Sequence, residues 1–272
     1  MANTVFTYSI AHGCPKGKRD LAGLLRPYPV RTSRLAPNAP GGQICRLAAA
    51  RAAILRPRTR CASRETSVYI KEKLDALGYC EVEGVLDTDM ATSITADLGP
   101  LRSLNGKMVQ TIHPRESSQA TSKSFSHHFG HEAFPLHTDT AFWPQPARYI
   151  IFQMSRASPT CSVVLPAHQT MRLFKSFQAR NPVFTRKTTS GACYSLPWHG
   201  DNLNCVLFDP CLMRPVNNAA AQLAKALEDA FDQAIPIEWT GSKALIVDNW
   251  RSLHGRGPAH GSDRTLTRFY RG

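Results

Sequence analysis

Three features are missing from this sequence of 272 residues, and each absence excludes a class of protein. No apolar run approaches the roughly 20 residues that a transmembrane helix needs, so we expect a soluble or at most peripheral protein. None of the 8 cysteines forms the Cys-x-x-Cys pair of a zinc ribbon. No signal-peptide pattern is present either, and we therefore interpret the cysteines as reduced thiols in a cytoplasmic protein.

Acidic residues are nearly absent from residues 1–65, which hold 12 Lys and Arg but only Asp20 and Glu65 as acids. This segment therefore carries most of the formal net charge of +13. It is rich in Arg, Pro, Ala and Gly and has little periodicity, which predicts a poorly ordered N-terminal extension. The same composition resembles an organelle transit peptide, which is the alternative to a cytoplasmic location.

Nucleic-acid binding is the function that a basic chain first suggests. A nucleic-acid-binding fold is expected to carry its basic face on the folded domain, whereas the basic residues here lie in the N-terminal extension. We therefore disfavour this function and keep binding through residues 1–65 only as an alternative. Deleting residues 1–65 would discriminate between the two functions, because an enzyme should keep its turnover, whereas a nucleic-acid-binding protein would lose its function.

The ordered domain is predicted to span residues 66–272, and it combines many short strands with few helices. Apolar residues recur at helical spacing in Asn217–Gln233, and Gly78 and Gly99 mark helix ends. This mixture predicts a mainly β fold with flanking helices, a sandwich or barrel built as a jelly roll. The predicted helices are 66–77, 88–98 and 217–233, the predicted strands are 79–82, 107–113, 135–140, 148–155, 161–166, 235–239, 243–249 and 265–270, and residues 114–133 are predicted to form a loop.

The strongest local signal for chemistry is His137-Thr138-Asp139, within a predicted strand. Alternate residues of a strand point to the same face, so the imidazole and the carboxylate would converge. Two histidines and one carboxylate on one face of a metal leave coordination positions open, which is the arrangement of non-haem Fe(II) oxygenases. His254 is the best candidate for the third ligand, because it lies in a polar turn after an apolar strand.

Arg264 and Arg268 follow His254 closely and, four residues apart, would share one face of a strand. A dicarboxylate that chelates the metal at one end needs a cation at the other. Arginine suits this role because its planar guanidinium grips a carboxylate with two parallel hydrogen bonds. A structural ion pair or a solvent-facing side chain is the alternative for either arginine, but the whole order of His-x-Asp, His and Arg is rarely accidental.

These pieces together resemble the taurine catabolism dioxygenase (TauD/TfdA) family, over about residues 70–272. The resemblance implies a double-stranded β-helix core and an Fe(II)- and 2-oxoglutarate-dependent dioxygenase, an oxidoreductase that uses O2 and releases succinate and CO2. The stretches that carry the resemblance are Phe134–Asp139, Pro144–Tyr149, Asp248–Trp250, Leu253–Arg256 and Asp263–Arg268.

The resemblance also implies roles for individual residues. The three catalytic metal ligands would be His137, Asp139 and His254. Arg268 would bind the distal carboxylate of 2-oxoglutarate, and Arg264 would lie near its metal-bound end. The family adds a Ser or Thr hydroxyl from a later strand, for which Ser162 fits best and Thr160 is the alternative. Asp139 argues against a halogenase, which has a small residue at this position.

The substrate is left open by the sequence. The family favours small polar substrates such as amino acids, sulfonates and other carboxylates, and hydroxylation, desaturation and cyclisation all remain, as does a homo-oligomer. A cupin-like metalloenzyme that needs no oxo acid and a catalytically inactive scaffold are the remaining alternatives. Side chains expected near the metal are candidates for the substrate pocket, with loop or core packing as the alternative for each. They are Ser124, Ser126, His127, His128, Phe142, Trp143 and, in a candidate lid over residues 191–201, Tyr194, Trp198 and His199.

Overall fold

The computed structural model describes residues 62–121, 124–200, 202–259 and 264–272. All of them belong to a unit that spans residues 44–272. The predicted N-terminal extension lies outside the described residues, apart from the first residues of helix α1 (Ala62–Leu77). No helix in the described part of the chain is long and apolar enough to cross a membrane.

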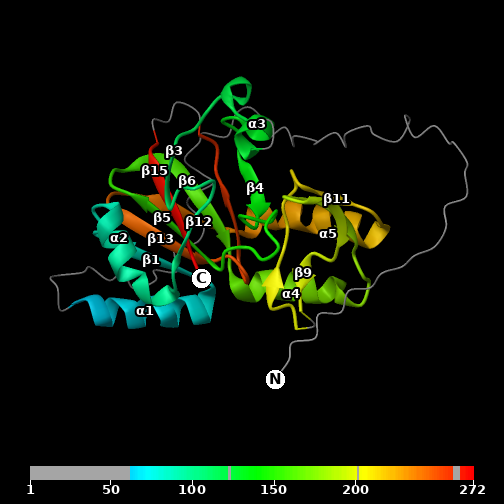
Figure 1. The fold of residues 1–272 in the computed structure, drawn as a ribbon, viewed down its shortest axis with the longest axis horizontal. Coiled ribbons are helices and arrows are strands. Elements are labelled where there is room, and N and C mark those ends of the chain that lie inside the picture. The colour runs from blue at the N-terminus through cyan, green and yellow to red at the C-terminus, as the bar shows by residue number, and fades with distance from the viewer. Residues whose placement is uncertain (1–61, 122–123, 201, 260–263) are drawn as a thin grey trace, which may run out of the picture. The chain divides into compact units, whose positions relative to one another are not determined.

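Two antiparallel β-sheets form the centre of this domain (Figure 1). The six-stranded sheet has the order β1 (Tyr79–Glu83), β13 (Lys243–Asp248), β5 (Tyr149–Met154), β15 (Leu266–Arg271), β2 (Leu101–Arg102), with β3 (Val109–Ile112) paired to β15. The four-stranded sheet has the order β12 (Ile235–Trp239), β6 (Ser158–Leu165), β14 (Leu253–Arg256), β4 (Phe134–His137). Neighbouring strands are far apart in the sequence, as in a jelly roll, and the predicted fold class is confirmed.

The two sheets are held together by a hydrophobic cluster of their facing side chains. It includes Phe152 and Leu245 from the six-stranded sheet and Val164 and Trp239 from the four-stranded sheet. Burying each such side chain stabilises the fold by roughly 1.5–3 kcal/mol. Strand β13 is buried at every position, because its other face is covered as well. This double burial explains why its sequence is a nearly continuous apolar run.

Helices cover the outer faces of both sheets (Figure 1). Helices α1 and α2 (Thr88–Ile94) pack on the six-stranded sheet through a cluster that includes Ile70 and Ile246. Helices α4 (Ala167–Gln178) and α5 (Asn218–Asp229) pack on the four-stranded sheet through a cluster that includes Phe174 and Leu223. Helix α4 was not predicted, although its buried residues recur at helical spacing.

Two of the predicted elements need correction. Residues 114–133 are not only a loop, because they contain the short helices η2 (Ser117–Gln119) and α3 (Phe125–Phe129). Ser124 starts α3, since its side chain accepts a hydrogen bond from the His127 N–H. The helix predicted over 88–98 is broken between α2 and η1 (Ala96–Leu98), and α5 likewise continues as η3 (Ala230–Gln233).

A third, smaller sheet was missed entirely. Its three strands are β11 (Met213–Pro215), β7 (Phe184–Thr188) and β8 (Gly191–Ser195), in that order. Beside it, β9 (Trp198–His199) pairs with β10 (Cys205–Val206). The described part of the candidate lid, residues 191–200, therefore contains β8, β9 and the segment that joins them.

Candidate metal centre

His137 and His254 are brought together by strand pairing. β4 and β14 are antiparallel neighbours, and His137 lies directly opposite His254 in their register. The two ring centroids are 4.3 Å apart. Gly255 permits this close pairing, because a Cβ atom at that position would lie 2.5 Å from the carbonyl oxygen of Phe134. The glycine after His254 is therefore required by the approach of β4.

Asp139 reaches the histidines by a route that differs from the predicted one. Strand β4 ends at His137, and Thr140, the residue after Asp139, has a positive φ of 57°, so the alternation of a continuous strand does not place Asp139. The buried side chain of Asn249 holds it instead. Its Oδ1 accepts a hydrogen bond from the Asp139 N–H at 2.9 Å, and its Nδ2 donates to the Asp139 carbonyl at 3.0 Å.

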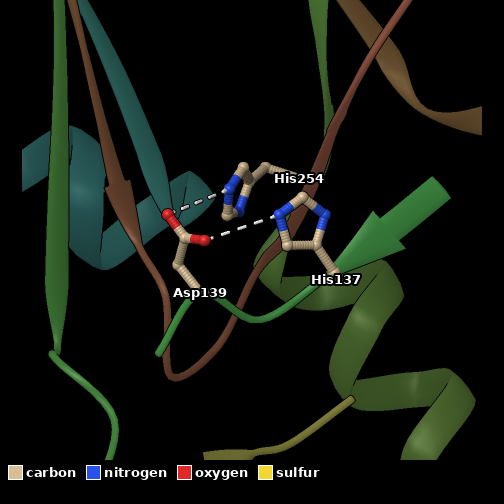
Figure 2. Close-up of side chains that lie close together, drawn as sticks. All are labelled: His137, Asp139 and His254. Carbon is tan, nitrogen blue, oxygen red and sulfur yellow. Dashed lines mark ion pairs between the residues drawn. The ribbon is translucent and has the colours of Figure 1, made fainter. Parts of the chain in front are cut away.

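The three side chains form the one His, Cys, Asp and Glu cluster with metal-binding geometry in the described residues (Figure 2). Their ligand atoms all lie within 4.8 Å of one another. The Asp139 carboxylate oxygens lie 3.6 Å from His137 Nε2 and 3.9 Å from His254 Nε2. All three residues are buried. A carboxylate and two imidazole nitrogens are thus aimed at one point.

The electrostatics keep this cluster ready for a cation. Burial alone would raise the pKa of Asp139, but Arg268 and the two histidines together lower it well below its usual range. Burial, together with the neighbouring charges of His137 and Arg268, lowers the pKa of His254 to about 3, although Asp139 acts in the opposite direction. His137 Nδ1 donates a hydrogen bond to the Pro135 carbonyl at 2.9 Å, which leaves Nε2 with its lone pair toward the cluster. These residues therefore fit a divalent metal.

Arg268 and Tyr270 contact the metal cluster itself. Arg268 Nη1 donates to Oδ2 of Asp139 at 2.9 Å, and the Tyr270 hydroxyl donates to the same oxygen at 3.2 Å. Arg268 also donates to Oε1 of Gln110 at 2.7 Å. The two terminal nitrogens of the Arg268 guanidinium, Nη1 and Nη2, thus donate to Asp139 and Gln110, respectively. Neither Gln110 nor Tyr270 was expected from the sequence.

Arg264 lies at a different place, on the four-stranded sheet. Its Nη2 donates to Ser162 Oγ at 2.9 Å, and the Trp239 indole N–H donates to the same hydroxyl at 3.2 Å. Arg264 is almost fully buried, and burial lowers its pKa to about 10. The predicted hydroxyl, Ser162, thus meets an arginine, whereas no hydrogen bond joins Thr160 to Arg264. Arg264 was expected near the metal-bound end of 2-oxoglutarate, but the arginine that bonds to the ligand Asp139 is Arg268.

Helix α3 covers one side of the cluster. The ring of Phe125 lies over the His137 imidazole with centroids 4.1 Å apart. The candidate residues Ser124, Ser126 and His127 belong to the same segment, and His127 Nδ1 lies 3.3 Å from the Ser117 carbonyl. Phe125, which the sequence did not single out, is thus the residue of this segment that contacts a metal ligand, whereas the roles of Ser124, Ser126 and His127 stay predictions.

The aromatic candidates have more varied positions. Phe142 and Trp143 pack edge to face just after Asp139, and Trp143 also contacts Tyr270. Trp198 is buried in the hydrophobic cluster under the four-stranded sheet, whereas Tyr194 is 74% exposed on β8. His199 lies on β9, next to Trp198. Of the aromatic candidates, Phe142 and Trp143 are therefore the two that lie next to the metal ligand Asp139 along the chain.

Asp209 is a buried acidic residue that the sequence did not single out. Burial raises its pKa to about 6, and the charges of His137 and Asp139 both act on it. Asp209 follows Phe208 in the chain. The Phe208 N–H donates a hydrogen bond to the Thr138 hydroxyl, and the Phe208 carbonyl accepts one from the Thr138 N–H. Thr138 stands between the metal ligands His137 and Asp139 in the sequence. One carboxylate oxygen accepts two backbone N–H groups, but no described residue forms an ion pair with Asp209.

Asn249→Ala tests whether the amide clamp positions the metal ligand. It removes both hydrogen bonds to the Asp139 backbone and a third to the Ala147 carbonyl. We expect Fe(II) affinity to fall by roughly 10- to 100-fold, the usual cost of losing a partner that orients a ligand. Isothermal titration under anaerobic conditions measures this. Asn202→Ala, at an exposed position, is the matched control, and unchanged Fe(II) affinity in Asn249→Ala would contradict the clamp.

Comparison with known proteins gives the fold a wider context. No protein-family model matches the sequence, and no match is found among curated proteins. Solved structures do match. Asparagine oxygenase with Fe(II), 2S,3S-3-hydroxyasparagine and succinate has a TM-score of 0.60 at 18% identity, over 78% of this chain and 79% of that one.

Two further matches have similar scores. The non-haem iron oxygenase OrfP with Fe and α-ketoglutaric acid has a TM-score of 0.57 at 17% identity, over 78% of this chain and 80% of that one. PvcB from Pseudomonas aeruginosa has a TM-score of 0.55 at 17% identity, over 80% and 84%. The chain therefore has the jelly-roll fold that these iron oxygenases share.

Proposed function

We propose that this protein is an Fe(II)- and 2-oxoglutarate-dependent oxygenase that hydroxylates or desaturates an amino acid or a related small polar acid. The observation that carries the proposal is the convergence of His137, Asp139 and His254 at one buried point. Two histidines and one carboxylate are the donor set of non-haem Fe(II) oxygenases. The shared jelly-roll fold of the matching iron oxygenases supports the same reading.

The chain's own residues would divide the work as follows. The two Nε2 atoms and the Asp139 carboxylate would hold Fe(II), and Arg268 would keep that carboxylate ionised and in place. When bound, the iron with 2-oxoglutarate and O2 supplies the oxidising power for C–H cleavage, with succinate and CO2 as co-products. Phe125, stacked on His137, would exclude water from one side of the metal.

Arg264 and Ser162 are the pair that we propose for the distal carboxylate of 2-oxoglutarate. The guanidinium and the hydroxyl already share a hydrogen bond of 2.9 Å, and a carboxylate can accept from both groups. Arg268 is committed to Asp139 instead, so it would lie at the metal-bound end. This assignment replaces the one expected from the resemblance, in which Arg268 bound the distal end.

Asp209 supports an amino acid as the substrate. A buried carboxylate without an ion pair, within range of the metal ligands, would attract an ammonium or guanidinium group. Two of the matching structures contain such molecules, 3-hydroxyasparagine with asparagine oxygenase and (3S)-hydroxy-L-Arg with OrfP. A cupin-like metalloenzyme without an oxo acid would leave the buried Arg264 and Ser162 pair without a function.

The test is an anaerobic titration of the apoprotein with Fe(II) and then with 2-oxoglutarate. We expect a metal-to-ligand charge-transfer band that appears only when both are present, followed by amino-acid-stimulated succinate release. Asp209→Asn should lose most of that stimulation while it keeps the band. If Fe(II) binds but 2-oxoglutarate produces no band, the cupin-like alternative replaces the proposal. A protein that takes up no Fe(II) contradicts both.

A further inference from the structure

The three-stranded sheet has an outer face whose charged side chains are all basic. Arg214, Thr185 and Tyr194 lie opposite one another across β11, β7 and β8, so they share one face. Lys187 and Ala192 form the next row of the same face. The alternate residues of β7, Phe184 and Arg186, are buried on the inner face. We call these five residues, Arg214, Thr185, Tyr194, Lys187 and Ala192, the outer face of the sheet.

This outer face combines positive charge with an exposed aromatic ring. Tyr194 is 74% exposed, and Lys187 and Arg214 are exposed as well. Neither basic side chain forms an ion pair with a described residue. The three strands and the turn between β7 and β8 contain no Asp or Glu. Tyr and Arg are enriched at the centres of protein interfaces, so this composition is typical of a docking surface.

Strand β8 leaves one edge of the sheet open. It is the last strand in the order β11-β7-β8, so no described strand pairs with its other edge. Soluble proteins usually protect such an edge with Lys, Pro, a bulge or a covering segment. The sequence of β8, Gly-Ala-Cys-Tyr-Ser, contains neither a charge nor a proline, and almost all of it is exposed. An extended segment could therefore add to β8 as a further strand.

The geometry of the row allows basic side chains to reach such a segment. Ala192 lies between Lys187 and the open edge, and its small side chain leaves the space above β8 free. An added strand would lie about 10 Å from β7, two strand spacings away. A lysine and a glutamate side chain can span that distance together. Acidic residues on the added strand would thus meet Lys187 across Ala192.

We propose that the outer face and the open edge of β8 bind an acidic polypeptide segment of a partner protein, which pairs with β8 and contacts Tyr194, Lys187 and Arg214. Charge complementarity distinguishes an acidic partner segment from two other possible occupants, a second copy of this chain and its own N-terminal segment. A second copy would bring the same basic residues together, and the N-terminal segment of this chain is itself strongly basic. Both are repelled, whereas an acidic segment is attracted.

The experiment measures binding of a fluorescein-labelled peptide of alternating Glu and Val, about eight residues long as for an ordinary strand. The full-length protein is titrated into the peptide and fluorescence anisotropy is followed. We expect Tyr194→Ala and Lys187→Glu each to weaken binding at least tenfold. Lys175→Glu, which makes the same charge change on the exposed face of α4, is the matched control. Circular dichroism confirms that each variant folds.

Four outcomes would overturn the proposal. One is equal binding to wild type, Tyr194→Ala and Lys187→Glu, which would assign the peptide to the basic N-terminal segment. A second is equal affinity for a Lys and Val peptide of the same length. A third is a concentration-dependent dimer in sedimentation that Tyr194→Ala abolishes, which would make a second copy the occupant. The fourth is binding of a single-stranded oligonucleotide, lost in Lys187→Glu, without binding of the acidic peptide.

Discussion

Arg264→Ala is expected to raise the apparent KM for 2-oxoglutarate by at least about 30-fold, because truncating one partner of a buried charge pair costs roughly 2–5 kcal/mol. The guanidinium is buried and bonds to Ser162, which leaves it well placed for a carboxylate. Fe(II) affinity should change little, since Arg264 donates its hydrogen bond to Ser162 and not to one of the three ligands. Succinate release at varied 2-oxoglutarate, with Fe(II) affinity measured separately, checks both expectations.

Arg268→Ala is the matched control, since it removes the same side chain four residues further along the chain. It takes away the hydrogen bond and the positive charge beside Asp139, so we expect Fe(II) affinity to fall instead. Arg264→Lys adds a finer test, because it keeps the charge but loses the planar fork. If Arg268→Ala raised KM for 2-oxoglutarate and left Fe(II) binding intact, the assignment expected from the family resemblance would be correct after all.

His254→Ala is expected to abolish succinate formation. It should lower Fe(II) affinity by more than the roughly 10- to 100-fold that the loss of an outer partner costs, since a direct ligand is removed. The imidazole is buried opposite His137, and no other His, Cys, Asp or Glu among the described residues joins the metal-binding cluster to replace it. His168→Ala, an exposed histidine of α4, is the control and should bind Fe(II) like the wild type. Undiminished Fe(II) uptake by His254→Ala would remove the basis of the metal centre.

His254→Ala is also expected to change how the stability of the apoprotein depends on pH. Burial lowers the pKa of His254 to about 3 from an ordinary 6.5, so the folded apoprotein keeps this imidazole neutral where the unfolded chain takes up a proton. The contribution of the neutral His254 imidazole to the free energy of unfolding is therefore complete above pH 6.5 and is lost as pH falls toward 3. Urea unfolding of the apoprotein across this range should show a shallower pH dependence in His254→Ala than in the wild type.

The sequence predicted most strands of the central sheets, because burial leaves a direct trace in residue type. Strand β12 has the predicted bounds, and β5, β6 and β13 differ from theirs by only a few residues. Strand β14, which carries His254, was wrongly placed in a polar turn, and β2 was not predicted. The three-stranded sheet was missed because its short strands are mostly polar, whereas α4 was missed although its buried residues have helical spacing. The role of Asn249 had no local signal beyond its place in a matching stretch, since its partner lies more than a hundred residues away.

The sequence by itself determined which side chains could hold a metal. His137, Asp139 and His254 differ from the other histidines and acids by their order and spacing, and a local pattern is enough to detect that. Only the tertiary structure decided how they meet and which protein groups the two arginines contact. The register of β4 against β14 and the reach of Asn249 to Asp139 are long-range contacts. Such contacts depend on the whole packed fold, so no local pattern contains them.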